Sequence, residues 1–135
     1  MKIIYRSNHK ITAEEFIDLL KRSTLDQRRP VDNKERIQSM LDHGNVLITA
    51  WDGNKLVGVS RGLTDYAFCC YLSDLAVDET YQHKGIGKEL VQLTHVESGE
   101  NTMLLLLAAP AATTYYPKIG MKKFEHCFYF PRKGQ

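Results

Sequence analysis

The residues with the clearest chemical potential are the two glycines and two lysines of Lys84-Gly85-Ile86-Gly87-Lys88. The apolar run Leu75-Ala76-Val77 precedes them, separated by a polar passage. After them, the apolar residues Ile86, Leu90 and Leu93 are spaced four and three positions apart, as on one face of a helix. This order predicts a strand, a loop and a helix, with both glycines where the helix begins.

A helix that begins at this glycine pair is suited to bind an anion. The first N–H groups of a helix have no partner within it, and the helix dipole adds roughly half a positive charge at the same end. Glycine lets a bulky ligand approach the backbone, and Lys84 and Lys88 flank the turn. We therefore predict a phosphate or pyrophosphate site here, in which His83 has at most a binding role.

A glycine pair alone also occurs where a loop simply ends, so the neighbouring residues decide between nucleotide-binding motifs. A P-loop would need Ser or Thr after the lysine, whereas Lys88 is followed by Glu89. A dinucleotide-binding fingerprint needs a third glycine, and that position is Leu90. Neither motif fits this sequence.

Two segments together resemble the GNAT superfamily of N-acetyltransferases. Leu75-Ala76-Val77, Asp78-Glu79, Tyr81 and Gln82-x-x-Gly85-x-Gly87 follow the order and spacing of its acyl-coenzyme A motif. The segment Ala112-Thr113-Thr114-Tyr115-Tyr116-Pro117-Lys118-Ile119-Gly120-Met121 is similar to its second landmark, a short helix with a tyrosine before a Gly-apolar pair.

The resemblance implies direct transfer of an acetyl group from acetyl-CoA, the cosubstrate, to a primary amine of a small molecule. It also implies which residues bind coenzyme A, namely Leu75, Ala76, Val77, Gln82, His83, Lys84, Gly85, Ile86, Gly87 and Lys88. Two positions depart from the family pattern. Gln82 replaces a more common arginine, and Ala108-Ala109-Pro110 stands where an asparagine often touches the cofactor, so the acetyl group itself is assumed from the resemblance.

Amine acylation also needs a proton donor for the leaving thiolate and a way to deprotonate the amine. The resemblance places the donor at Tyr116; adjacent helical residues point about 100° apart, so Tyr115 is the better candidate for packing. Asp74 is the first candidate for the base, and a structural carboxylate is the alternative reading of the same residue. Tyr71 and Glu79 are weaker candidates.

The elements that position these residues begin with two helices. Thr12 and Glu15 form a capping box that predicts a helix through Ser23. A second box, Asp32 with Glu35, predicts a helix that ends at Gly44. A short first strand is expected over residues 2 to 6.

A sheet accounts for most of the remaining sequence. Asp52-Gly53-Asn54 predicts a hairpin between strands 46–51 and 55–63, and a third antiparallel strand begins near residue 68. Its apolar phase shifts by one residue, which predicts a β-bulge near Ser73-Asp74. Residues 102–107 predict a central strand covered on both faces, residues 111–119 a short helix, and residues 124–130 a closing antiparallel strand.

The predicted fold class is therefore mixed α/β (α+β). Its central sheet is mixed but mostly antiparallel, with helices on both faces and one splayed strand pair. The resemblance implies that the pantetheine arm of coenzyme A enters the splayed gap and pairs with backbone groups around Leu75 and Val77, as an added strand would.

Composition sets the remaining expectations. The 135 residues fit one acyltransferase domain over 1–135, and a net charge of +2 gives no support for nucleic acid as a partner. No signal or membrane-spanning segment is evident, so we expect a cytoplasmic protein that does not engage membranes. The three cysteines are expected to be reduced, no spacing suggests a metal site, and a homodimer through the final strand is an open expectation.

Three alternatives remain open from the sequence. The protein could hold an acyl-coenzyme A without catalysis, as a sensor or regulatory module. It could acetylate a protein amine, or it could be an interaction domain that binds no coenzyme A.

Overall fold

The structure is a computed structural model that describes residues 2–134, and its centre is one five-stranded sheet. The strand order is the order of the sequence, β1-β2-β3-β4-β5. Neighbouring strands are antiparallel except for β5, which runs parallel to β4. The strands are β1 (Ile3–Ser7), β2 (Val46–Asp52), β3 (Lys55–Thr64), β4 (Cys69–Val77) and β5 (Met103–Leu105).

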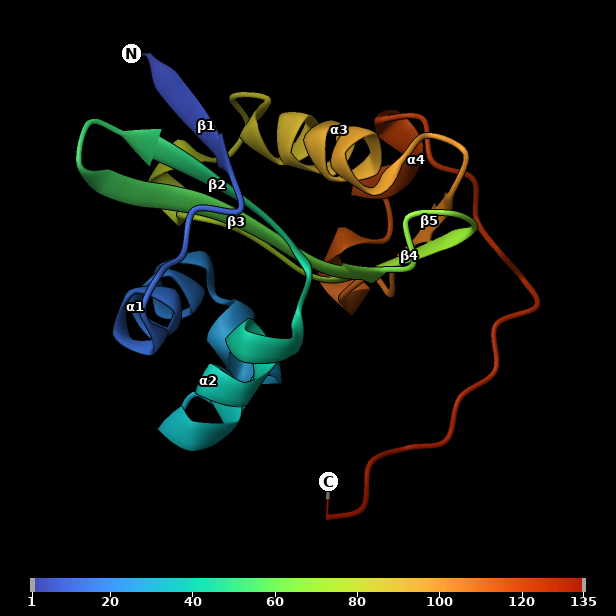
Figure 1. The fold of residues 1–135 in the computed structure, drawn as a ribbon, viewed down its shortest axis with the longest axis horizontal. Helices are drawn as coiled ribbons and strands as arrows, with labels where there is room; N and C mark the ends of the chain where they lie inside the picture. The colour runs from blue at the N-terminus through green and yellow to red at the C-terminus, as the bar shows by residue number, and fades with distance from the viewer. Residues whose placement is uncertain (1, 135) are drawn as a thin grey trace.

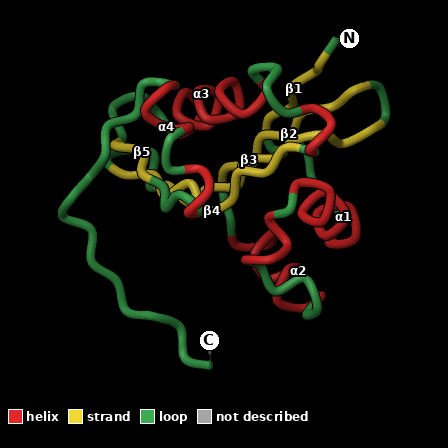
Figure 2. Tube along the Cα trace, turned by 180° about the vertical axis from the view of Figure 1, so that it is seen from behind, coloured by secondary structure: helices red, strands yellow, loops and turns green. Residues whose placement is uncertain are grey.

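Helices cover both faces of this sheet (Figure 1). Helices α1 (Ala13–Ser23) and α2 (Lys34–His43) lie on one face, and α3 (Ile86–Ser98) and α4 (Tyr115–Lys118) lie on the other, as the reverse view also shows (Figure 2). Three short 3-10 helices are η1 (Leu25–Arg28), η2 (Glu79–Tyr81) and η3 (Pro110–Ala112). The predicted fold class is confirmed.

Each face has its own hydrophobic core, which fixes the helices against the sheet. Phe16, Leu19 and Leu20 of α1 are fully buried on one side, where Ile37 of α2 joins them. On the other side, Ile86 and Leu90 of α3 pack on Ile48, Ala50 and Val57. Helices α1 and α3 therefore bury their apolar sides on opposite faces of the sheet.

Several local predictions are confirmed. The capping box of α1 is present, with the Thr12 hydroxyl accepting from Glu15 N–H and the Glu15 carboxylate accepting from Thr12 N–H. Strands β2 and β3 form the predicted hairpin. Arg61 of β3 pairs with Asp74 and the next residue, Gly62, pairs with Leu72, so the extra residue of the β-bulge is Ser73.

The capping box predicted at Asp32 and Glu35 is wrong. Helix α2 begins one residue later, and its N-cap is Asn33, whose side chain accepts from Arg36 N–H. Asn and Asp are almost equally good N-caps, so the sequence alone did not separate the two adjacent candidates.

Two predictions about the C-terminal part are also wrong. Strand β5 lies at the edge of the sheet rather than in its centre, and it ends at Leu105. Residues 124–130 form no strand and lead away from the body of the molecule (Figures 1 and 2), with Phe128 and Phe130 91% and 100% exposed. The predicted helix over 111–119 is divided between η3 and α4, and Gly120, with φ of 98°, follows its end.

Candidate active site

The start of α3 has the features of an anion site. Gly85 is its N-cap, with φ of 83°, a conformation that glycine adopts without strain, and the helix is not capped by a side chain. The first hydrogen bond within the helix runs from Glu89 N–H to Gly85 C=O, at 3.1 Å, so the preceding N–H groups have no partner inside the helix. A Cβ added at Gly85 would meet nothing within 4 Å, so the space above the turn is open.

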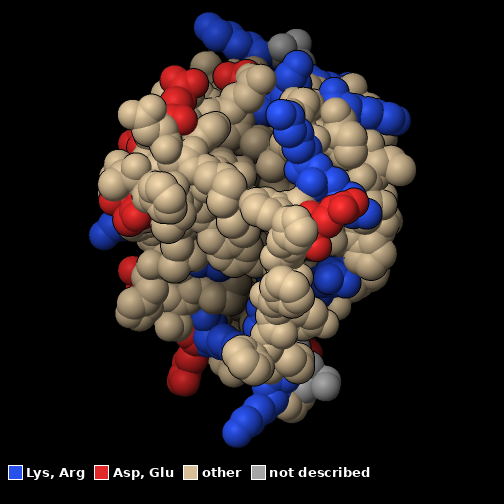
Figure 3. All heavy atoms as spheres, turned by 90° about the vertical axis from the view of Figure 1, so that its right-hand side faces the viewer, with Lys and Arg blue, Asp and Glu red and all other residues tan. Residues whose placement is uncertain are grey.

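Side chains around this turn leave it accessible and basic. His83, Lys84 and Lys88 are exposed, whereas the side chain of Ile86 is buried in the core and can offer a ligand only its backbone. Figure 3 shows one face of the molecule, on which basic side chains lie mainly toward the upper right and the bottom and acidic side chains lie mainly along the left edge.

Gly87 has a different environment from Gly85. A Cβ at this position would lie 2.7 Å from the hydroxyl oxygen of Tyr115, which is closer than real contacts allow. The absence of a side chain at Gly87 therefore lets α4 pack closely against the first turn of α3.

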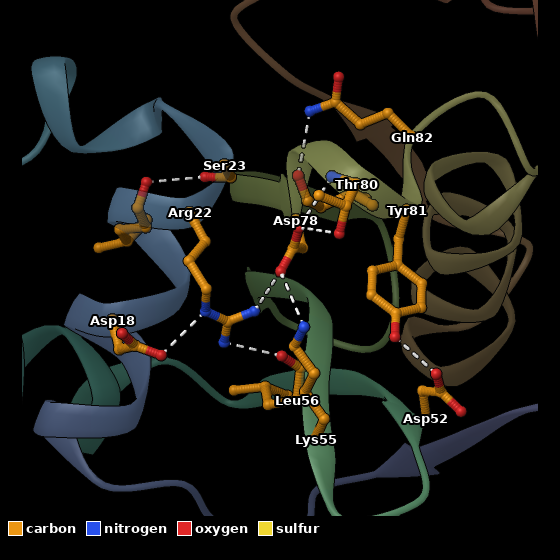
Figure 4. Close-up of polar contacts among 12 residues, drawn as sticks. Asp18, Arg22, Ser23, Asp52, Lys55, Leu56, Asp78, Thr80, Tyr81 and Gln82 are labelled. Carbon is orange, nitrogen blue, oxygen red and sulfur yellow. Dashed lines mark hydrogen bonds and ion pairs between the residues drawn. The ribbon is translucent and has the colours of Figure 1, made fainter.

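The loop before α3 is held to the body by the buried carboxylate of Asp78 (Figure 4). Asp78 accepts from Arg22 of α1 at 2.6 Å and from both the N–H and the hydroxyl of Thr80. Burial by itself would raise the pKa of Asp78, but the hydrogen bonds from Thr80 and Arg22 outweigh it, and the pKa is lowered. The carboxylate is therefore charged at neutral pH and ties the loop to α1.

Two further contacts fix the same loop (Figure 4). The Tyr81 hydroxyl donates to Asp52 at the end of β2, at 2.5 Å. The side-chain amide of Gln82 donates to the backbone carbonyl oxygen of Val77, at 3.0 Å. The loop before α3 is thus joined to α1 on one face of the sheet and to β2 and β4 of the sheet itself.

A cavity of about 660 Å³ begins beside this loop and follows β4. Pairing between β4 and β5 extends only from Cys69 with Met103 to Tyr71 with Leu105, and beyond that point the two segments separate. The predicted splayed strand pair is therefore present. Its cavity is lined by Leu75, Ala76, Val77 and Gln82 on the β4 side, by Leu106, Leu107 and Ala109 beyond β5, and by Tyr116.

The edge of β4 that faces this cavity offers backbone groups at a regular interval. Asp78 N–H bonds to Val57 on β3, whereas the carbonyl oxygen of Val77 accepts from Gln82 on the cavity side. Backbone groups alternate in direction along an antiparallel strand, so Leu75 directs its N–H and C=O to the same side as Val77. These are the groups an extended ligand would pair with.

The two adjacent tyrosines of α4 have separate surroundings. Tyr116 lines the cavity, while Tyr115 lies against Gly87, and their rings meet edge to face at 5.2 Å. Burial raises the pKa of Tyr116, and nearby Tyr115 raises it further, while Arg29 partly opposes the shift. The Tyr116 phenol is therefore protonated at neutral pH.

Asp74 occupies a site that does not suit a general base. Its side chain is 0% exposed, and its two oxygens accept separately from Arg29 and Arg61. Both guanidinium groups also reach the bulge, because Arg29 donates to Ser73 C=O at 2.7 Å and Arg61 donates to the Ser73 hydroxyl at 3.1 Å. The arrangement matches the structural alternative and leaves no carboxylate oxygen directed into the cavity.

Sequence reasoning missed the three arginines that fix the site, Arg22, Arg29 and Arg61. Each lies at least 13 residues from the carboxylate that it binds at the site, Asp78 or Asp74, so nothing local marks these contacts. The only local signal was Asp78 with Thr80 two residues later, a pattern in which the carboxylate bonds the following backbone. Tyr71 and Glu79 do not line the cavity.

Two features are absent from residues 2–134. No group of three or more His, Cys, Asp or Glu side chains is arranged to hold a metal ion. Within the same range, no helix has the length and apolar character needed to cross a membrane.

A cavity that begins beside the loop leading to an open helix N-terminus, follows a free strand edge and is lined by a protonated phenol suits a long cosubstrate with an anionic end and a reactive end. Comparison with known proteins agrees with this class. Residues 13–120 match the Acetyltransferase (GNAT) family, and the chain belongs to that family.

Relatives of known name or structure share most of their length with this protein. The uncharacterized N-acetyltransferase ycf52 of Porphyra purpurea is 25% identical and aligns over 98% of this chain and 80% of its own. A GNAT family acetyltransferase of Streptococcus pneumoniae TIGR4 has the same fold, with a TM-score of 0.71, 19% identity, and coverage of 98% and 100%. Aminoglycoside N-acetyltransferase AAC(6')-Iy, solved in complex with CoA, has a TM-score of 0.72, 15% identity, and coverage of 98% and 95%.

The family establishes the general activity. The protein is an acetyltransferase, and its family uses acetyl-CoA as the acetyl donor.

Proposed function

We propose that this protein transfers an acetyl group from acetyl-CoA directly to a primary amine of a small molecule. The observation that carries the proposal is the continuity of one cavity from Val77 and Gln82, beside the open start of α3, along the free edge of β4 to Tyr116. The aminoglycoside N-acetyltransferase with the same fold supports a small-molecule acceptor.

The start of α3 is proposed to bind the pyrophosphate. The free N–H groups after Gly85 and the positive end of the helix dipole favour an anion there. The exposed side chains of Lys84, Lys88 and His83 surround the same turn and add hydrogen-bond donors. Asp78 and Tyr81 hold the loop in place, so little conformational entropy is lost when the ligand binds.

The free edge of β4 is proposed to bind the pantetheine arm. The backbone groups of Leu75 and Val77 would pair with its two amides, in the manner of an added strand. The side-chain amide of Gln82 donates to the carbonyl oxygen of Val77. The ligand therefore has to displace this amide or bind beside it. Ala76 contributes apolar surface to the same wall.

Tyr116 is proposed as the proton donor. The acceptor nitrogen attacks the thioester carbon, a C–N bond forms, the C–S bond breaks, and the thiolate needs a proton as it leaves. The raised pKa of Tyr116 keeps the phenol protonated until well above neutral pH, so a proton is available when the sulfur requires it.

The amine proton is proposed to leave through water. No Asp, Glu or His lines the cavity among the described residues, and Asp74 is bound by two arginines. An alkyl ammonium with a pKa of ~10.4 is almost entirely protonated at neutral pH. The rate of acetyl transfer is therefore expected to rise with pH as the neutral amine accumulates. Loss of the Tyr116 proton then lowers the rate again at still higher pH, beyond the usual range of a tyrosine, because the pKa of Tyr116 is raised.

The test is release of free thiol from acetyl-CoA with a panel of small amines, in wild type, Tyr116→Phe and Tyr115→Phe. We expect kcat to fall about a hundredfold in Tyr116→Phe and to change little in the matched Tyr115→Phe variant. The alkaline decline should also disappear in Tyr116→Phe. A wild-type rate across pH in Tyr116→Phe would remove Tyr116 from the chemistry, and acetyl-CoA binding without thiol release would instead favour the sensor alternative.

A further inference from the structure

The cavity wall carries basic side chains and no acidic ones. Of the described residues that line it, Arg28 and Arg29 are charged, and none is Asp or Glu. Asp26, on the same short helix as Arg28, does not line it. A site for a polyamine or another polycation needs carboxylates to bind its ammonium groups. The guanidinium groups of this wall would instead repel those ammonium groups.

The positive charge of this wall is only partly neutralised inside the protein. Asp74 is the shared partner of Arg29 and Arg61, so one carboxylate faces two guanidinium groups and one positive charge is left over. Arg28 is exposed, and among residues 2–134 no acidic side chain forms a salt bridge with it. Its backbone is held, because Arg29 donates to the Arg28 C=O at 2.8 Å.

These arginines lie away from the proposed pyrophosphate site. Arg29 bonds Ser73 at the bulge, whereas Val77 and Gln82 line the part of the cavity beside α3. Val77 lies four positions after Ser73 along the strand, a distance of about 13 Å. Tyr116 is close enough to Arg29 for the pKa of Tyr116 to be affected. The proposed proton donor therefore lies at the end of the cavity lined by Arg28 and Arg29, the arginine end.

We infer that the acceptor is an amine whose molecule also carries an anionic group, a carboxylate or a phosphate, and that Arg28 binds this group. The inference rests on the proposed function, since it assigns the arginine end of the cavity to the acceptor. Arg28 is thereby a specificity-determining residue. A guanidinium suits both anions because its planar donors can bind two oxygens at once.

The test compares paired acceptors that differ in the presence of one anionic group. The pairs are γ-aminobutyrate with its amide and phosphoethanolamine with ethanolamine, and spermidine serves as the polycation. Steady-state kcat/KM is measured for each in wild type, Arg28→Gln and Arg28→Glu. Arg36→Gln and Arg36→Glu are the matched controls, because Arg36 is exposed on α2 and does not line the cavity.

We expect wild type to prefer the anionic member of at least one pair by about tenfold, and the preferred pair tells carboxylate from phosphate. Arg28→Gln should remove this preference by raising KM for the anionic member with little change in kcat. Arg28→Glu should shift the preference toward spermidine, and the Arg36 variants should behave as wild type. A wild-type preference for spermidine or for both neutral amines, or an unchanged preference in Arg28→Gln, would overturn the inference.

Calorimetric titration of acetyl-CoA without acceptor separates this inference from the proposed function. Acetyl-CoA binding and thiol release with the wrong acceptor preference would refute only the assignment of Arg28. Absence of acetyl-CoA binding would refute both.

Discussion

Replacing Asp74 with Asn distinguishes a structural carboxylate from a catalytic base. The substitution keeps the size of the side chain but leaves Arg29 and Arg61 without their shared negative charge. Removing one member of a buried ion pair costs about 3–5 kcal/mol. Arg61 is almost fully buried, but the Arg29 side chain is 21% exposed and can recover hydrogen bonds from water. We therefore expect a loss near the lower limit, about 3 kcal/mol, equivalent to a fall in Tm of roughly 10 °C.

The assay combines urea unfolding with kcat measured well below the Tm of the variant. Asp32→Asn is the matched control, because Asp32 is exposed and its side chain makes no contact seen in the part of the protein that the structure describes. A structural Asp74 predicts a large loss of stability with most of kcat retained in the folded variant. The reasoning fails if Asp74→Asn unfolds like wild type and kcat falls a hundredfold or more, as loss of a general base would require.

Two further predictions test the packing of α4 and the acid stability of the fold. Gly87→Ala should be neutral or destabilising in wild type, because its Cβ would meet the Tyr115 hydroxyl, but should stabilise by up to ~1 kcal/mol in a Tyr115→Phe background through helix propensity. Urea unfolding of the four proteins should give a coupling energy of about 1 kcal/mol, and additive effects would contradict the contact. Asp65 accepts three backbone N–H bonds, from Phe68, Ala67 and Cys69, which lower its pKa from 3.8 to about 2. Since the folded pKa is the lower one, the stabilisation is present above pH 3.8 and is lost as the pH falls through about 2, so Asp65→Asn should flatten the pH dependence of unfolding across that interval. An unchanged acid limb in that variant would exclude this role.

The parts of the fold that could be predicted are those whose causes lie within a few residues. The capping box of Thr12 and Glu15 closes within one helical turn, and the hairpin at residues 52–54 is set by its own turn chemistry. The bulge at Ser73 was visible because a one-residue change of phase leaves a trace in the apolar pattern. The open turn at Gly85 was predictable because its cause is also local: the glycine and the helix that follows it are adjacent in the sequence.

The parts that could not be predicted depend on partners distant in sequence. An apolar run such as residues 103–107 indicates a strand but not its place in the sheet, which depends on whether another segment pairs with its outer edge. Residues 124–130 carry the alternation of a strand, yet they pair with no strand in the structure. The choice between a base and a structural carboxylate at Asp74 was equally hidden, because Arg29 lies 45 residues away and its approach follows from the path of the loop after η1.

The cluster around Asp74 joins the two halves of the proposed site. Its carboxylate and the bulge at Ser73 fix the middle of β4, near where the thioester is proposed to lie, while Arg29 belongs to the segment that bears Arg28. The strand edge and the α3 turn are built from backbone groups, which many side chains can support, so the proposed coenzyme half is expected to tolerate changes such as Gln82. The proposed acceptor half is built from side chains of the α1–α2 connection, where one substitution would alter the charge of the cavity wall. Acceptor preference is therefore expected to change through Arg28 without loss of acetyl-CoA binding.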